Sequence, residues 1–344
     1  MSMFKFSVGP WNVHEGADAF GPEVRSSISF DQKLRKFKEI GFTGIQFHDD
    51  DAVPDMNELS EDQIKSRARE LKQFLDEQGL EAEFVAPRLW MDARTIDGGF
   101  TSNSSADREF AIWRALRSID IAKELGSDRL VLWLAREGTL CSESKDPVLS
   151  LHRLREAINI MLAYDPQIRI LIEPKPNEPI DRSFVPTVGH VLGFANGTQD
   201  PSRVGALLES AHAVLAGLEP SLEMAFCLAH GKLWGVHLND QNGLRYDQDK
   251  SFGVENIRSA FNQLKVLIDH GYGSNGEYIG LDVKAMRTQS AAMSYAHLEN
   301  SLRIVKLIES KVRRFDKDLV LKYQDARNYE AIEMYVMELL LGEQ

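Results

Sequence analysis

Residues 30–51, FDQKLRKFKEIGFTGIQFHDDD, carry the pattern that predicts the fold of this protein. Four apolar residues have the spacing of one helix face: Phe30, Leu34, Phe37 and Ile40. Gly41 follows them and is typical of a helix C-terminal cap. The apolar run at residues 43–47 then has the length and composition of a buried strand, and the polar cluster HDDD comes directly after it. A helix that leads through a glycine into a strand is one step of a βα repeat.

The same alternation of strand and helix patterns continues along the chain. A capping box at residues 60–63 opens a helix that stops at Gly79 before the next strand. We predict eight strands, at residues 4–8, 43–47, 81–85, 129–134, 169–173, 204–208, 234–238 and 278–282. Eight βα units predict an α/β fold, the TIM (β/α)8 barrel.

A doubly wound open sheet is the rival architecture. Such a sheet normally carries a glycine-rich phosphate turn after an early strand, and Gly9-Pro10-Trp11 is not such a turn. The segment 311–344 is charged, has a helical pattern and lacks a strand. We therefore expect a catalytic barrel over residues 1–310 and a short C-terminal helical tail, which would serve as an oligomer contact.

Composition excludes several classes of function. The 344 residues include 40 Lys and Arg against 52 Asp and Glu, so the net charge of −12 argues against a nucleic-acid partner or an anionic membrane surface. Two cysteines cannot form a disulfide framework, and no apolar run reaches the length of a signal peptide or a membrane span. We expect a soluble cytoplasmic protein.

Reactive side chains follow six of the eight predicted strands. In a TIM barrel the active site lies at the C-terminal ends of the strands. The candidates there are His48 with Asp51, Trp133, Glu173 with Lys175, Glu209 with His212, His237, and Asp282. The pattern therefore predicts an active site at this end of the barrel.

Carboxylates and histidines in this set have the spacing of metal ligands. Glu209 and His212 lie three residues apart, which allows them to share one ion, although a lone histidine is more often structural. Asp247 and Asp249 lie in a polar loop, where alternating carboxylates either chelate a cation or are solvated. With Glu173 and Asp282, five carboxylates would face one mouth and raise some of their pKa values. Two divalent cations and Lys175 would balance that charge, so we predict a site for two metal ions.

Tryptophans supply a second line of evidence. Trp11, Trp90 and Trp133 each fall at or just after a strand end, where an indole can wall a sugar ring or simply pack under a loop. Trp113 and Trp234 lie in a helix and in a strand, where core packing is expected. We predict that the first three line a substrate pocket.

Over roughly residues 4–310 the chain resembles the xylose isomerases, especially their shorter actinobacterial-type class. The strings that carry the resemblance are FHDDD at 47–51, DGGFT at 97–101, Trp133 followed by REG at 136–138, EPKPNEP at 173–179, PTVGH at 186–190, and QNG at 241–243 followed by YDQD at 246–249. The similarity implies a TIM-barrel aldose-ketose isomerase that uses two divalent cations, Mg, Mn or Co, in a homotetramer, or in a dimer if the short C-terminal arm weakens it.

Residue roles follow from the same resemblance. It implies a first metal held by Glu173, Glu209, Asp282 and His237, and a second metal held by Glu209, His212, Asp247 and Asp249. It implies that His48, oriented by Asp51, opens the cyclic sugar by proton transfer, that Lys175 holds the oxygen at C1, and that hydride moves between C1 and C2. It also implies that Phe20 reaches into a neighbouring subunit's site.

The chain departs from the family at three places. His237 stands where the family has Asp, so we expect Mn or Co to be favoured over Mg, although Asn239 or Asp240 are alternative ligands. Arg88, in Ala86-Pro87-Arg88, replaces part of a Thr-Thr-Asn segment and is predicted to contact substrate, so the natural sugar need not be xylose. Leu207-Leu208 replaces Asn-Pro before the bridging carboxylate.

Two alternatives stay open beside the isomerase. One is a ketose 3-epimerase, which uses one metal and a pair of Glu side chains. The other is a non-catalytic sugar-binding relative. A metal-dependent abasic-site nuclease would need a basic groove, which this composition does not supply.

Overall fold

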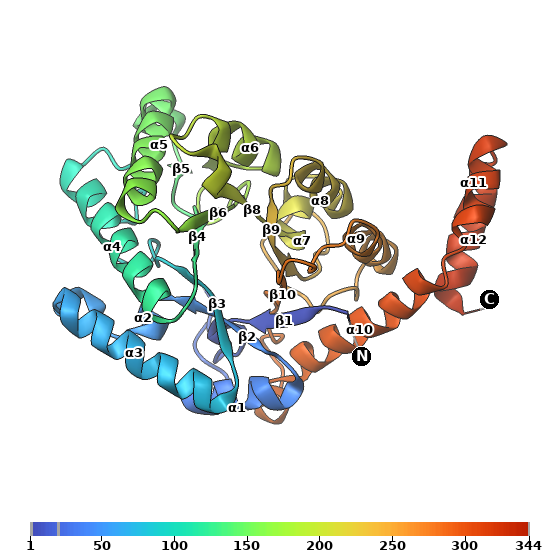
Figure 1. Ribbon diagram of the computed structural model, residues 1–344, viewed down its shortest axis with the longest axis horizontal. Coiled ribbons are helices and arrows are strands. Elements are labelled where there is room, and N and C mark those ends of the chain that lie inside the picture. Colours follow the sequence, from blue (N-terminus) through green and yellow to red (C-terminus); the bar gives the residue numbers. More distant parts are fainter. Residues whose placement is uncertain (1–2, 19–20, 343–344) are drawn as a thin grey trace.

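The computed structural model describes residues 3–18 and 21–342 and contains a closed barrel of eight parallel strands (Figure 1). Around the barrel the strands follow the order β1, β10, β9, β8, β6, β4, β3, β2. Their bounds are β1 Lys5–Val8, β2 Gly44–His48, β3 Glu81–Ala86, β4 Arg129–Trp133, β6 Arg169–Glu173, β8 Val204–Glu209, β9 Leu233–Leu238 and β10 Tyr278–Leu281. Each strand lies within one residue of its prediction, and the predicted TIM barrel is confirmed.

Helices surround the barrel, one following each strand in the described residues. This outer ring consists of α1 Phe30–Ile40, α3 Glu61–Gln78, α4 Ser105–Glu124, α5 Pro147–Tyr164, α6 Val188–Asn196, α8 Pro220–Ala229, α9 Ile257–Asp269 and α10 Ala296–Arg313. Two short helices, α2 (Asp49–Ala52) and α7 (Ser210–Leu215), directly follow β2 and β8. A small two-stranded sheet pairs β5 (Gly138–Thr139) with β7 (Arg182–Ser183).

Local sequence signals place the helix ends. Ser60 and Gln63 form the predicted capping box at the start of α3, and Gly41 and Gly79 end α1 and α3 in the left-handed conformation. Glycine adopts that conformation without the steric cost that a Cβ atom would add. The expected helix boundaries are therefore confirmed at these positions.

The barrel interior holds a compact apolar layer below a polar mouth. Its buried members are Phe84, Ala86, Val131, Leu171, Leu207 and Trp234. A larger apolar core lies between the strands and the outer helices. This inner layer fills the barrel, so side chains at the C-terminal strand ends lie above an apolar floor.

The pairing of β8 with β9 contains a register shift. Ala206 pairs with Leu233 and Leu207 pairs with Gly235, so Trp234 is an extra residue in β9. The Trp234 ring fills the space beside Gly205 in the barrel interior. A second shift occurs between β2 and β3, beside Ile45 and Gln46.

Two helices, α11 (Lys317–Asp325) and α12 (Tyr329–Leu341), extend beyond the barrel at the end of α10 (Figure 1). Phe315, between α10 and α11, contacts Phe261 of α9 and Tyr335 of α12. The helix α10 itself continues past residue 310 to Arg313. Within the described part of the chain, every helix is too short or too polar to cross a membrane.

Candidate active site

Four side chains converge at the C-terminal end of the barrel. Glu173 ends β6, Glu209 ends β8, His237 lies in β9, and Asp282 follows β10. Each offers one ligand atom, and these atoms all lie within 4.8 Å of one another. Two carboxylates and the imidazole are buried, while Asp282 is partly exposed. The structure thus brings together all four residues expected at a first metal, with His237 facing the barrel interior.

A second group shares Glu209 with the first. Because α7 begins directly after Glu209, His212 lies one helical turn further on and returns to the same carboxylate. Its Nε2 atom is 3.2 Å from Glu209 Oε1 and 3.2 Å from Asp247 Oδ2. Asp247 comes from the loop after β9, so two neighbouring strands contribute to this group. The arrangement matches three of the four ligands expected at a second metal.

Several ligand atoms in both groups are buried and have no hydrogen-bond partner among the described residues. They are Glu209 Oε2, His212 Nδ1, His237 Nε2 and Asp247 Oδ1. Leaving such atoms unpaired in a protein interior is costly. Carboxylate oxygens and imidazole nitrogens are ligands for divalent ions such as Mn²⁺, Co²⁺ and Zn²⁺. The residues present therefore fit divalent cations at both groups.

Charge crowding shifts the pKa values in these groups in opposite directions. Burial raises the pKa of Glu209 well above its usual value, and the charges of Asp247 and Asp282 raise it further. Burial also opposes ionisation of Glu173, but contacts to His237 and His212 outweigh it and lower the pKa of Glu173 to about 2. For His237, nearby Glu173 outweighs the effect of burial and raises the imidazole pKa well above its usual value. The pKa of Glu209, one of the five carboxylates predicted to face the mouth, is thus raised, mainly by its burial.

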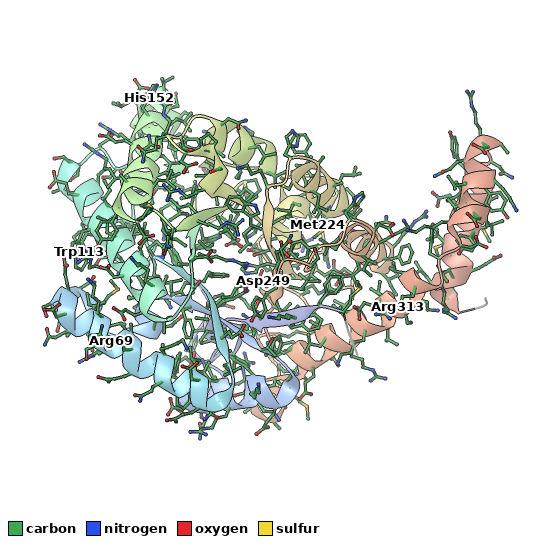
Figure 2. The ribbon with its side chains drawn as sticks, in the orientation of Figure 1. Arg69, Trp113, His152, Met224, Asp249 and Arg313 are labelled. Carbon is green, nitrogen blue, oxygen red and sulfur yellow. The ribbon has the colours of Figure 1, made fainter. Side chains whose placement is uncertain are left out.

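Asp249 lies outside both groups. Its side chain pairs with Lys284 and accepts a hydrogen bond from Asn239 Nδ2 at 3.1 Å. Burial raises its pKa well above the usual value, and the charge of Asp247 adds to this effect. Figure 2 shows Asp249 near the middle of the molecule, at the barrel. The structure does not bring this predicted ligand into either group, and its carboxylate is paired with Lys284 instead.

Lys175 lies between the second group and the aromatic wall. Its Nζ atom is 2.9 Å from Asp247 Oδ2 and 3.2 Å from Glu178 Oε2. The same atom lies 5.2 Å from the centre of the Trp133 ring. Burial disfavours the charged form, but Asp247 and Glu178 outweigh it and raise the lysine pKa. Lys175 therefore presents a buried ammonium at the mouth.

His48 and Asp51 form the predicted pair. His48 Nδ1 lies 2.9 Å from Asp51 Oδ2, because α2 begins at Asp49 and returns Asp51 to the end of β2. Arg88, predicted to contact substrate, lies 2.8 Å from the same Nδ1 atom and 2.8 Å from Asp51 Oδ1. Its Nε atom also faces Asp50 at 2.7 Å. The guanidinium is thus held by protein groups around His48.

The three predicted tryptophans form one continuous wall with His48. Ring centres are 4.3 Å apart for Trp11 and His48, 5.0 Å for His48 and Trp90, and 4.6 Å for Trp90 and Trp133. Trp11 Nε1 donates a hydrogen bond to Asp282 at 3.0 Å, which connects the wall to the first group. Trp113 stacks on Phe110 of α4 but is only partly buried and lies outside the apolar core, so the expected core packing is wrong for this residue. Figure 2 shows it at the outer edge of the molecule. Phe20 lies outside the described residues.

Two residues at the site were not assigned a role from the sequence. Asn239, considered there only as an alternative ligand, donates through Nδ2 to Glu209 at 2.8 Å and to the Asp282 carbonyl at 2.9 Å. Its Oδ1 atom accepts the backbone N–H of Ala211 at 2.8 Å. Lys284, which neutralises Asp249, lies two residues after Asp282. Each of the two residues lies two positions after a candidate ligand, Asn239 after His237 and Lys284 after Asp282. Side chains two positions apart in an extended chain point to the same side, and this was the signal in the sequence that could have found them.

Comparison with known proteins places this architecture in a family. A model of xylose isomerase-like TIM barrels matches residues 34–277, and the chain belongs to that family. Its fold is similar to that of an L-ribulose 3-epimerase, with 15% identity, a TM-score of 0.65, and coverage of 91% of this chain and 96% of that one. A D-psicose 3-epimerase from Clostridium cellulolyticum H10 gives 13% identity and a TM-score of 0.63, with coverage of 88% of this chain and 99% of that one. A 3-keto-D-glucoside 4-epimerase from E. coli gives 15% identity and a TM-score of 0.61, with coverage of 88% of this chain and 99% of that one.

Proposed function

We propose that this protein is a divalent-metal-dependent isomerase that interconverts an aldose and a ketose. The observation that carries the proposal is the position of the His48 and Asp51 pair across an indole from two ligand groups that share Glu209. An acid-base pair beside a candidate two-metal site is the set of groups that ring opening and subsequent hydrogen transfer require. The fold family and the sugar enzymes that share its architecture support a small sugar as substrate.

The chain's own residues have distinct tasks in this proposal. Glu173, Glu209, His237 and Asp282 would hold one cation, and Glu209, His212 and Asp247 would hold a second. When bound, Mg²⁺, Mn²⁺ or Co²⁺ would supply Lewis-acid polarisation of the sugar oxygens at C1 and C2.

Proton transfer belongs to His48. The imidazole would take a proton from the anomeric hydroxyl and deliver one to the ring oxygen, while Asp51 fixes the ring orientation. Lys175 would hold the C1 oxygen of the open sugar through its ammonium. Trp11, Trp90 and Trp133 would cover the hydrophobic face of the sugar and exclude water from the carbons that react.

Hydrogen would then move between C1 and C2 without exchange with solvent. The proposal assigns no protein base to C1 or C2, because the carboxylates of the site are assigned to cations. The test is turnover of an aldose carrying deuterium at C2, in H2O and with added Mn²⁺. Retention of the label in the ketose supports the proposal. Washout in each turnover contradicts it and assigns a base role to a side chain.

A ketose 3-epimerase is the second candidate function. It is favoured by the buried carboxylates Glu173 and Glu209, which both belong to the first ligand group, and by the 3-epimerases that share the fold. Two opposed carboxylates can remove a proton from one face of C3 and return one to the other. Incubation of ketoses in D2O separates the two functions, because an epimerase incorporates deuterium at C3 and an aldose-ketose isomerase does not.

The tail and the quaternary structure are part of the same proposal. Residues 1–310 would form the catalytic domain, and residues 311–344 would contact another subunit of a homotetramer or dimer. Met334, Met337 and Leu341 lie exposed on α12, at the spacing of one helix face. Sedimentation of the M334E/M337E variant should show a smaller assembly than the wild type. An unchanged assembly would remove the tail from the interface.

A further inference from the structure

The Nδ1 atom of His48 has two partners with opposite requirements. Asp51 Oδ2, at 2.9 Å, can only accept a hydrogen bond, whereas Arg88 Nη2, at 2.8 Å, can only donate one. A neutral imidazole carries one proton, so Nδ1 either donates to Asp51 or accepts from Arg88. When Nδ1 is protonated, Nε2 is bare and can accept a proton. When Nδ1 is bare, Nε2 carries the proton and can donate it.

Arg88 is held in this position independently of His48. Its Nη2 atom donates to Asp51 Oδ1 at 2.8 Å, and its Nε atom lies 2.7 Å from Asp50 Oδ1. Its backbone N–H donates to Asp49 Oδ1 at 3.1 Å. Loss of the imidazole would therefore leave the guanidinium in place.

A buried arginine of α4 supports the aspartates that hold Arg88. Arg114 donates two hydrogen bonds of 2.7 Å to Asp49 and one of 3.1 Å to Asp50. Ser118 adds a hydrogen bond to Asp49 at 3.1 Å. Arg114 and Asp49 are 4% and 0% exposed, so this support lies in a rigid part of the molecule.

We propose that Arg88 is a positioning residue that competes with Asp51 for Nδ1 of His48 and so sets the share of the neutral ring whose Nε2 is bare. The catalytic consequence rests on the proposed isomerase function. In ring opening the anomeric hydroxyl gives its proton to Nε2, and the C1–O5 bond breaks with its electron pair going to O5. Nε2 then returns a proton to O5, and O1 becomes the carbonyl oxygen. This step starts from the ring with Nδ1 protonated and Nε2 bare, so competition by Arg88 lowers the share of His48 that is ready to take the proton.

The direct test is the tautomer of His48, measured by ¹⁵N NMR without any sugar. The protein is labelled at its nine histidines, held at pH 9 with diamagnetic Mg²⁺, and His48 is assigned by its loss in H48N. We expect the wild-type Nδ1 and Nε2 shifts to lie between those of protonated and bare nitrogens. In R88M, Nδ1 should become fully protonated, since only Asp51 remains. In D51N, Nε2 should become predominantly protonated.

Two further variants show whether the effect is specific. R88K should restore intermediate shifts, because an ammonium can also donate to Nδ1. R94M is the matched control, since Arg94 lies in the same loop, pairs with Asp92 and is 49% exposed. It should leave the His48 spectrum unchanged. A single tautomer in the wild type, or wild-type shifts in R88M, would overturn the proposal.

Turnover provides the second readout. R88M should raise kcat on a pyranose aldose by up to about twofold, because all of the His48 rings then have a bare Nε2. Conversion of glyceraldehyde to dihydroxyacetone should be unchanged, because a triose forms no ring and needs no ring opening. A loss of turnover on the pyranose aldose, or the same gain on both substrates, would overturn the positioning role. If the wild type converts no sugar, the proposed function fails, while the NMR result still decides what Arg88 does at His48.

Discussion

At the residue scale, Glu209 connects the two ligand groups. It ends β8, is 1% exposed, and contacts His212 and Asn239 as well as facing His237. Its Oε2 atom has no hydrogen-bond partner in the described structure. One carboxylate with an unpaired oxygen between two groups is suited to bridge two cations.

Replacement of Glu209 should therefore remove both cations together. We expect Glu209→Ala to retain close to zero Mn²⁺ per chain after gel filtration, and Asp247→Asn, which affects only the second group, to retain about one. Metal content is measured by ICP-MS on protein whose circular dichroism is unchanged. The control is Glu109→Ala, an exposed carboxylate of α4, which should retain wild-type metal. Wild-type metal content in Glu209→Ala would show that this residue bridges nothing.

His237 should give the first group a preference for softer ions and a dependence on pH. Its pKa is raised above the usual histidine value, because Glu173 outweighs the effect of burial, so cation binding must displace a proton. We expect affinity to rise with pH through the neutral range and to favour Mn²⁺ or Co²⁺ over Mg²⁺. Titration calorimetry in buffers of different ionisation enthalpy measures the released proton. His237→Asp should shift the preference toward Mg²⁺; an unchanged metal order would assign the fourth ligand elsewhere.

The sequence predicted the candidate ligands of this site better than it predicted the side chains that pair with them. Glu173, Glu209, His237 and Asp282 could be found because strand ends in a barrel share one edge. Asp249 was grouped with them on its spacing and on the family resemblance, and its pairing with Lys284 depends on how two separate loops fold together. The contacts of Arg88 with His48 likewise need the three-dimensional positions of β2 and β3.

At the scale of the elements, α10 is joined to the first barrel loop by a buried histidine. His297, 7% exposed, donates from Nε2 to the backbone carbonyl of Asn12 in the short helix η1 (Pro10–Asn12) at 2.8 Å. Burial lowers its pKa to about 4. Asn12 in turn accepts the backbone N–H of Val283 through its Oδ1 atom at 2.6 Å. The neutral imidazole therefore supports the loops that carry Trp11 and Asp282.

This histidine should make folding sensitive to acid. Between the ordinary pKa of 6.5 and the folded value of about 4, the unfolded chain binds the proton and the folded chain does not. Stability is therefore retained above pH 6.5 and lost as the pH falls toward 4, by about 3 kcal/mol from this group. Urea unfolding at pH 7 and pH 4 measures the loss. His297→Gln, which can still donate to Asn12, should lose about 3 kcal/mol less than the wild type over the same interval; equal losses would contradict the assignment.

The sequence predicted the ends of the long helices more closely than it predicted the two-residue strands. The caps at Ser60, Gly41 and Gly79 are local, so the ends of α1 and α3 could be read from neighbouring residues. The two-residue strands β5 and β7 pair segments more than forty residues apart. Two residues carry no periodicity, so this pairing could not be predicted.

At the scale of the whole molecule, the candidate ligands join four neighbouring strands of the barrel. They come from β6, β8 and β9 and from the residue after β10, and these four strands are consecutive in the barrel. A cation bound there would link the half of the barrel that closes onto β1. Binding at this position should therefore stabilise the folded barrel as a unit.

We expect chelation to lower the melting temperature and abolish turnover. At a free metal concentration one hundred times Kd, each site contributes about 2.7 kcal/mol to the folded state. For a chain of this size that corresponds to a shift of about 4 °C per site. Differential scanning calorimetry with EDTA and with excess Mn²⁺ measures the shift in melting temperature. The melting temperature of Glu209→Ala should be the same in both. Identical melting in both buffers would show that the barrel binds no stabilising ion.

The extra residue in β9 allows two side chains three positions apart to face the barrel interior. Trp234 and His237 would face opposite sides of a regular strand. The bulge allows the indole to fill the barrel floor and the imidazole to reach its mouth. An in-frame loss of codon 234 would remove the bulge and the indole together, while Gly235 and His237 would keep their pairing with Leu207 and Glu209. The ligand would stay at the mouth and the barrel would lose its floor, so in this strand one additional codon supplies the filling without displacing the chemistry.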